Sequence, residues 1–170
     1  NTLTGGSGND SITGGSLSDT ITGAGGVDTL VGGTGDDTYV YASSADFVDS
    51  TTNHAVVDSI SDLGGTADRA LVSGAILIEA DDSLSRAVGV DVIEAATNSA
   101  NALAHSIVID SNAELQDVRT IDLDASSNAG STGVVNLTGV TVGTTIMGVS
   151  AGNNTLTGGS GNDSITGGSL

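Results

Sequence analysis

The sequence of 170 residues contains no cysteine and no proline, and it has only three aromatic residues. The absence of cysteine excludes a disulfide framework, a thiolate metal site and a thiol nucleophile. Tyr39, Tyr41 and Phe47 are too few to build a core around large rings. We therefore expect a core that is thinner than the core of a conventional globular protein.

Basic residues are also scarce, because three arginines stand against 21 acidic residues and the formal net charge is -18. Such a chain is repelled by nucleic acid phosphates and by anionic membranes, so cations are its natural counterions. No run of about 18 apolar residues is present, and no membrane-spanning helix is predicted. The chain begins at Asn1 without a signal peptide pattern, and we expect it to be a segment of a longer protein.

The residues that are abundant favour short strands joined by tight turns. Glycine occurs 26 times, and the apolar residues are mostly Val, Ile, Leu and Ala set among Thr, Ser and Asn. The predicted fold class is therefore all-β. A high content of acidic residues is also typical of a merely soluble or a disordered chain. The positions of the acidic residues along the sequence distinguish these alternatives from cation binding.

A long repeat joins the two ends of the chain. Residues 1–17 and 154–170 both read NTLTGGSGNDSITGGSL, an identity at an offset of 153 residues. The simplest interpretation is a tandem array with a unit of 153 residues. The alternative is a local duplication that places the same cassette at both ends of one domain. Both interpretations describe a modular protein.

A shorter repeat of nine residues begins at Gly5. Four consecutive copies read GGSGNDSIT, GGSLSDTIT, GAGGVDTLV and GGTGDDTYV, and GGSGNDSIT returns at 158–166. A degenerate copy, VSAGNNTLT, covers 149–157. The shared pattern is GGxGxDxUx, in which U is apolar. Aspartate recurs in register at Asp10, Asp19, Asp28, Asp37 and Asp163, and asparagine takes its place at Asn1 and Asn154.

These nonapeptides resemble the RTX family of secreted calcium-binding β-roll proteins, over residues 1–40 and 149–170. The resemblance implies a calcium-binding parallel β-roll or β-solenoid with two nonapeptides in each coil. Equivalent turns would then stack 18 residues apart, pairing Asp10 with Asp28 and Asp19 with Asp37. Asn1 would lie over Asp19, and Asp163 would pair with the next unit's copy of Asp28. About three calcium sites per unit follow.

The chemistry of the pattern points to the same ion. Glycines let the backbone turn so that carbonyl oxygens converge, and each aspartate adds a negative charge. Calcium takes about six to eight oxygen ligands, and the pattern offers no nitrogen or sulfur ligand. Stacked carboxylates repel one another without metal, so we expect folding to require calcium. The candidate metal-site residues are Asp10, Asp19, Asp28, Asp37, Asp163, Asn1, Asn154, Gly6, Gly8, Gly15, Gly26, Gly33, Gly35, Gly159 and Gly161.

Two substitutions interrupt the glycine pattern. Leu17 replaces the glycine at the fourth position of its nonapeptide, and Ala24 replaces the glycine at the second position of the next one. Glycine is favoured at such positions because it adopts positive φ angles without steric cost. Asn1 and Asn154 each remove a charge, and the calcium sites that include Leu17 or either asparagine depart most from the pattern.

The middle segment, residues 41–148, has fewer glycines and several short apolar stretches. A continuous solenoid is favoured over an inserted β-sandwich, because repeats bury their faces against neighbours. Residues 149–170 would begin the next RTX block. Helical turns are the interpretation of 98–106 and of parts of 81–88. Strands are predicted at 55–60, 69–80, 89–95, 106–110, 118–125, 133–142 and 145–149.

No catalytic constellation is recognised, and we predict that the protein is not an enzyme. His54 and His105 are interpreted as solvated loop residues rather than as members of a Ser/His/Asp triad. Carboxylate pairs such as Asp81 with Asp82, and Asp122 with Asp124, are interpreted as solvated faces or secondary calcium contacts.

The leading hypothesis is a calcium-rigidified tandem unit of a secreted bacterial surface protein, such as a filament, a surface layer or an adhesin. Its expected partners are calcium and further copies of itself, stacked end to end. The alternative is a non-catalytic secretion and folding module of a type I-secreted enzyme, toxin or adhesin. A third hypothesis, binding of ice or sugar, would use a regular threonine face at Thr4, Thr13 and Thr22, which Val31 and Val40 interrupt.

Overall fold

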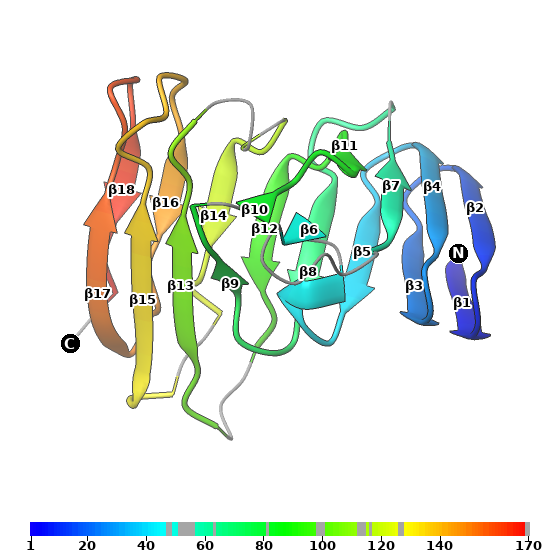
Figure 1. Ribbon diagram of the computed structural model, residues 1–170, viewed down its shortest axis with the longest axis horizontal. Coiled ribbons are helices and arrows are strands. Elements are labelled where there is room, and N and C mark those ends of the chain that lie inside the picture. Colours follow the sequence, from blue (N-terminus) through cyan, green and yellow to red (C-terminus); the bar gives the residue numbers. More distant parts are fainter. Residues whose placement is uncertain are drawn as a thin grey trace.

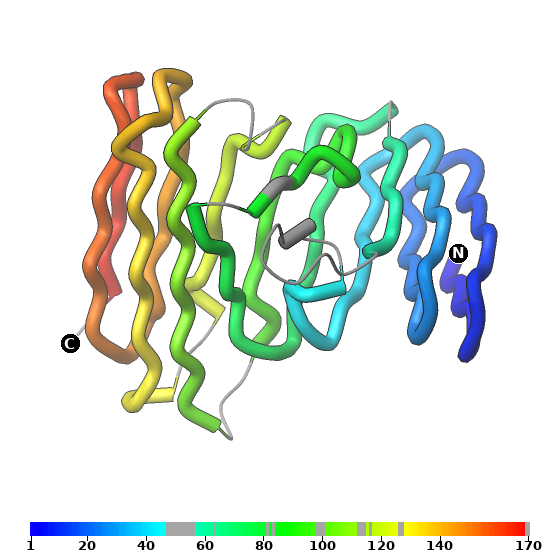
Figure 2. The backbone as a smooth tube through the Cα atoms, viewed as in Figure 1, coloured from blue at the N-terminus to red at the C-terminus, as the bar shows by residue number. Residues whose placement is uncertain are grey.

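The computed structural model describes residues 1–46, 49–50, 57–62, 64–80, 82–97, 101–111, 115, 117–125 and 128–168. Regular structure in these ranges is almost entirely β-strand, together with one 3-10 turn, η1 (Ser44–Asp46). Successive strands follow a rising coil, which the backbone tube traces from one end of the molecule to the other (Figure 2).

One parallel sheet, called the long sheet here, runs the whole length of the coil (Figure 1). Neighbouring strands in it are consecutive turns of the coil, which is the arrangement of a β-solenoid. Its strands, in spatial order, are β1 (Thr2–Ser7), β3 (Thr20–Gly25), β5 (Thr38–Tyr41), β8 (Arg69–Val72), β12 (Val92–Ala95), β14 (Thr120–Asp122), β16 (Thr145–Met147) and β18 (Ser164–Thr166).

Two shorter parallel sheets receive the alternate strands of the coil. The N-terminal short sheet consists of β2 (Ser11–Ser16), β4 (Thr29–Thr34), β7 (Ser59–Ser61) and β11 (Ala87–Val88). The C-terminal short sheet consists of β9 (Leu77–Ile78), β13 (Ala104–Val108), β15 (Ser131–Asn136) and β17 (Gly152–Thr157). Between them lies an antiparallel pair, β6 (Asp49–Ser50) with β10 (Asp82–Ser83).

The core consists of columns of apolar side chains that point inward from equivalent positions of the stacked strands. Each inward residue is flanked by outward residues, because side chains alternate along a strand. The register pairs Ile21 with Tyr39, Tyr39 with Ala70 and Ala70 with Ile93, and all four are fully buried. The long-sheet column is Leu3, Ile21, Tyr39, Ala70, Ile93, Ile121, Ile146 and Ile165.

The solenoid prediction is confirmed, because parallel pairing continues from β1 to β18 through the middle segment. The predicted strand at 69–80 is wrong in one respect: it divides into β8 and β9, which belong to different sheets. The chain turns at Ser73, whose amide donates to the Tyr41 carbonyl, and at Gly74.

No helix forms in the described parts of the two regions predicted as helical turns, although residues 85–86 lie in a turn in which the Ala87 amide donates to the Leu84 carbonyl at 2.8 Å. Residues 82–83 and 87–88 are strands, and β13 begins at Ala104, whereas 98–100 lie outside the described residues. His105 is 1% exposed on β13, so it is a core residue and not a solvated one. His54 lies outside the described residues. Among the described residues, no helix has the length and apolar character to cross a membrane.

Candidate metal centre

Three turns stack at the edge where the chain enters the long sheet: residues 14–19, 32–37 and 62–68. A Cβ atom on Gly33 would clash with the carbonyl oxygen of Gly15, and one on Gly64 would clash with that of Gly33. Gly15 and Gly33 have φ angles of 116° and 117°, which side chains of L-residues rarely allow. Glycine at these positions therefore lets one turn lie directly on the next.

The turns at the opposite edge stack in the same way. A Cβ atom on Gly26, at a φ of 129°, would lie 2.6 Å from the carbonyl carbon of Gly8. On the first edge, Gly35, at a φ of 116°, lies over Leu17 in the same way. Gly6 and Gly8, in the first turn, do not adopt positive φ angles.

The two departures from the glycine pattern fall on positive φ angles. Leu17 has a φ of 69° and Ala24 a φ of 76°. These are the left-handed values that the replaced glycines would adopt without cost. The Leu17 side chain is 78% exposed, so no burial of apolar surface offsets its backbone strain.

Asp19, Asp28 and Asp37 each use one carboxylate oxygen to bind the preceding turn of the stack. The Asp10 amide donates to Asp28 Oδ1 at 2.8 Å, and the Asp19 amide donates to Asp37 Oδ1 at 2.7 Å. The Asn1 side chain donates from Nδ2 to Asp19 Oδ1 at 2.8 Å. The structure therefore brings these residues together in two ladders, one along each edge of the coil.

The second oxygen has no hydrogen-bond donor in three of these aspartates. Asp19, Asp28 and Asp37 are 2%, 1% and 0% exposed, and the Oδ2 atom of each is buried without a partner. A buried carboxylate oxygen without a donor is strongly unfavourable, and a bound cation would satisfy it. Asp10 differs, since its Oδ2 accepts from the Gly6 amide at 2.7 Å.

Carbonyl oxygens complete an oxygen-only environment around these carboxylates. A Cβ atom placed on Gly14 would lie 2.5 Å from Asp19 Oδ2 and 2.6 Å from the Gly32 carbonyl oxygen. A Cβ atom on Gly5 would lie 2.5 Å from Asp10 Oδ2 and 2.6 Å from the Gly23 carbonyl oxygen. The stacked turns thus aim carboxylate and carbonyl oxygens at the same glycine-lined space, which fits a hard cation such as calcium.

Comparison with known families agrees with this chemistry. The family model of the RTX calcium-binding nonapeptide repeat matches four copies, over residues 1–16, 13–48 and 149–169. The two ends of this chain are RTX calcium-binding repeats. Calcium is therefore their cofactor, and proteins with such repeats are generally secreted. No curated protein and no solved structure matched the chain.

Both aspartate ladders extend beyond the RTX repeats, which the sequence interpretation missed. The Asp28 amide donates to Asp58 Oδ1 at 2.8 Å, and the Asp37 amide donates to Asp68 Oδ1 at 2.7 Å. The Asp68 amide in turn donates to Asp91 Oδ2 at 3.1 Å. The signal that would have found these residues is the triplet D-x-U, which recurs as DSI at 58–60, DRA at 68–70 and DVI at 91–93.

The C-terminal RTX block stacks on a turn of the middle segment and not on another RTX turn. Gly159 and Gly161 stack over Val140 and Val142, which belong to the middle segment. Asp163 Oδ1 accepts from the Thr144 amide at 2.9 Å. Asn154 accepts from the Val149 amide at 2.8 Å and donates to the Val149 carbonyl at 3.0 Å. Neither residue lies beside a second nonapeptide aspartate within the described chain.

Three buried carboxylates meet where the RTX turns join the middle segment. Asp37, Asp62 and Asp68 each offer an oxygen, and these oxygens lie within 4.8 Å of one another. Burial, reinforced by the neighbouring carboxylates of Asp62, Asp37 and Asp91, raises the pKa of Asp68 to about 6. Burial also raises the pKa of Asp37. The Tyr39 hydroxyl donates to Asp62 Oδ2 at 2.7 Å.

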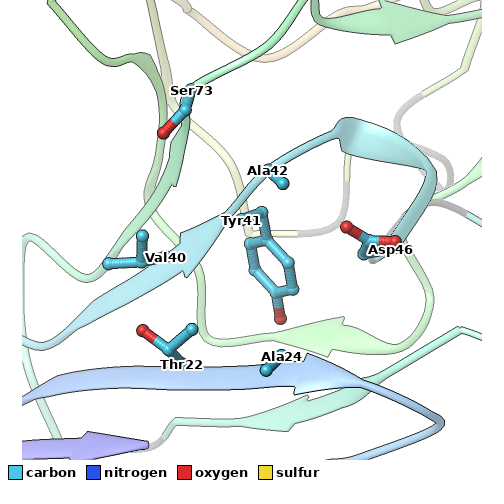
Figure 3. Close-up of a pocket in the computed structure, with 7 residues that line it drawn as sticks. All are labelled: Thr22, Ala24, Val40, Tyr41, Ala42, Asp46 and Ser73. Atoms are coloured by element: carbon cyan, nitrogen blue, oxygen red, sulfur yellow. The ribbon is translucent and has the colours of Figure 1, made fainter. Parts of the chain in front are cut away.

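A cavity of about 340 Å³ lies in the N-terminal half of the solenoid. Figure 3 shows the Tyr41 ring within it, above Ala24, with Asp46 to one side. Burial raises the pKa of the Tyr41 hydroxyl. Asp46 supplies the one carboxylate among the described lining residues. Its lining residues are Thr22, Ala24, Val40, Tyr41, Ala42, Asp46 and Ser73.

The predicted threonine face is not formed as one surface. Thr4 pairs with Thr22 on the long sheet, where Val40 follows at the equivalent position of β5. Thr13 lies on the N-terminal short sheet, paired with Val31. A flat threonine ladder for ice or sugar binding therefore extends over only two strands of the long sheet at this position.

Proposed function

We propose that this chain is a structural unit, repeated in tandem, of a secreted bacterial surface protein or extracellular filament, and that calcium folds and rigidifies it. The observation that carries the proposal is the set of buried Oδ2 atoms of Asp19, Asp28 and Asp37, which have no partner inside a continuous solenoid. A cation between the turns would satisfy these oxygens and stabilise the coils that carry them.

The two carboxylate oxygens of the stacked aspartates have different roles in binding the ion. The aspartate Oδ1 atoms fix the spacing of the turns through the amide 18 residues earlier, and the Oδ2 atoms remain directed at the glycine-lined space. Calcium supplies the positive charge that cancels the repulsion between these carboxylates. Because extracellular calcium is near the millimolar range, the unit would fold after export.

The tandem arrangement follows from the ends of the solenoid. Strands β1, β2, β17 and β18 each have one edge without a partner strand in the described chain. Unpaired edges bind further strands, and a following copy of the unit supplies them. The identity of residues 1–17 with 154–170 indicates what that copy would be.

The alternative function is a non-catalytic RTX secretion and folding module of a type I-secreted protein whose activity lies elsewhere. The RTX match over residues 1–48 and 149–169 favours it equally. The two functions differ in the behaviour of several linked units, because only a structural array lengthens into a stiff rod as units are added.

The test is circular dichroism with light scattering on this chain, titrated with calcium from zero to about 10 mM, with magnesium as the control. We expect β-structure to form with calcium and not with magnesium, since magnesium requires a smaller octahedral site. A chain that is fully folded in chelator and unchanged by calcium would contradict the proposal.

A further inference from the structure

We propose that Asp37, Asp62 and Asp68 form a calcium site that joins the RTX turns to the middle segment. The family match ends at residue 48, so two of these three residues lie outside the RTX repeats. All three carboxylates are buried, and one oxygen from each lies within 4.8 Å of the other two.

The orientation of the oxygens is the observation that points to a bound cation. Asp37 is 0% exposed, and its Oδ2 has no hydrogen-bond partner. A Cβ atom on Gly32 would clash with Asp37 Oδ2 and with Asp62 Oδ2, so both oxygens converge on the space that this glycine leaves open. The Tyr39 hydroxyl lies at the same place and donates to Asp62 Oδ2.

The number of charges distinguishes this site from the regular RTX sites. A pair of stacked RTX turns brings together two aspartates, whereas this site brings together three carboxylates. Calcium affinity rises with the charge of the ligand set. The site should therefore bind before the regular sites and order the last RTX turn, residues 32–37, against residues 62–68.

Calcium stoichiometry and affinity of the whole chain, measured by native mass spectrometry and calorimetry, test the site. We expect Asp62→Asn to lose one bound calcium from the tightest class and to weaken that class by at least tenfold. Glu79→Gln removes the same charge from an exposed residue just after β9 and should change neither quantity. Unchanged stoichiometry and affinity in Asp62→Asn would overturn the proposal.

Terbium luminescence keeps the proposal testable if Asp62→Asn does not fold. The chain has two tyrosines and no tryptophan, and Tyr39 touches the proposed site. With terbium as the probe, Tyr39→Phe should remove most of the sensitised emission, and Tyr41→Phe should remove less. Equal loss in the two variants, or a larger loss in Tyr41→Phe, would overturn the assignment.

A second observation concerns the identical cassettes, which lie on different faces of the solenoid. In the first cassette, 1–17, the strand β1 belongs to the long sheet and β2 to the N-terminal short sheet. In the second, 154–170, the equivalent of β1 is β17, in the C-terminal short sheet, and the equivalent of β2 is β18, in the long sheet. The same sequence has therefore exchanged faces after 153 residues.

We infer that consecutive units stack with a rotation of about half a turn around the solenoid axis, an inference that rests on the proposed tandem array. Thr2 pairs with Thr20 in the first coil. One unit later the same pairing would place the next copy of Thr20 beside Thr155, the equivalent of Thr2, on β17. The partner of the exposed edge of β17 is thus the β3 strand of the next copy, on the opposite face.

A chain of four units tests this arrangement, because the sequence contains no cysteine and a single one can be labelled. Val134 is 38% exposed on β15, so Val134→Cys in every unit accepts biotin and then streptavidin. Electron micrographs in calcium should show streptavidin on alternating sides of a straight rod. Streptavidin on one side only would overturn the half-turn and leave the array intact, whereas the absence of rods in calcium would contradict the proposed function itself.

Discussion

At the residue scale, the two oxygens of Asp28 and Asp37 have separate roles. Oδ1 accepts a backbone amide from the preceding coil, as in the bond from Asp19 to Asp37, and Oδ2 is left buried for a cation. Asn1 and Asn154 stand at the aspartate position of the pattern and make hydrogen bonds, but a neutral amide oxygen adds no negative charge for a cation. The sequence pattern predicted these positions because aspartate recurs every nine residues.

The strained φ of Leu17 gives a first prediction. Leu17→Gly should raise the free energy of unfolding of the calcium-bound chain by about 1 kcal/mol, because glycine adopts a φ of 69° without steric cost. Chemical denaturation in excess calcium measures it. Leu77→Gly is the matched control, since Leu77 is also exposed but lies in a strand, and there the substitution should destabilise. A loss of stability in Leu17→Gly would contradict the argument.

The buried histidine gives a prediction on pH. Burial lowers the pKa of His105 from its ordinary value of 6.5, and its Nδ1 accepts from the Ile76 amide at 3.2 Å. A lowered pKa contributes stability above pH 6.5 that is lost as the pH falls through the lowered value, because the unfolded chain binds the proton first. The Tm of the wild type should therefore fall more steeply between about pH 7.5 and 5.5 than that of His105→Gln. Parallel Tm curves for the two proteins would show that His105 does not titrate in this way.

At the scale of elements, the triplet of an acidic or polar residue, an outward residue and an inward apolar residue begins the strands of the long sheet. In the RTX turns the acidic residue follows the first glycine by five residues, whereas Asp68 follows Gly64 by four and Asp91 follows the single glycine Gly89, so the nonapeptide pattern alone could not find the later copies. Strand existence was predictable there because the apolar residues alternate. The division of 69–80 between two sheets was not, since it depends on how Ser73 packs on the preceding coil.

Position within the long sheet determines what each inward residue contributes to stability. Ile93 is fully buried and its strand is paired on both sides, so Ile93→Ala should lower the free energy of unfolding by about 2–5 kcal/mol. Ile165 is 46% exposed on the last strand, and Ile165→Ala should cost less than about 1 kcal/mol. Denaturant unfolding in calcium measures both. Equal costs would mean that a further strand already covers β18.

At the scale of the whole molecule, stability without calcium should vary along the axis. Inward residues of the first coil, Leu3 and Ile12, are only partly buried, whereas Ile93 and Ile121 in the middle are fully buried. The buried aspartates with unpartnered oxygens lie chiefly in residues 19–37. Calcium therefore matters most where the apolar core is thinnest.

Hydrogen exchange after addition of a chelator tests this gradient. Amides of β1–β5 should lose protection first, and those of β12–β16 should retain it longer, because local stability follows buried apolar contacts. Magnesium in place of calcium should give the chelator pattern. Simultaneous loss of protection along the whole chain would indicate instead that the solenoid unfolds as one cooperative unit.

The break between the two short sheets has a mechanical consequence. The long sheet is continuous, whereas on the other face the chain passes from β9 in one short sheet to β11 in the other before it returns to β12. Two faces that are built differently have unequal lengths, so a single unit is expected to be curved. Units that alternate by half a turn would bend in opposite directions, and their curvatures would cancel. A long array of bent pieces would then be straight.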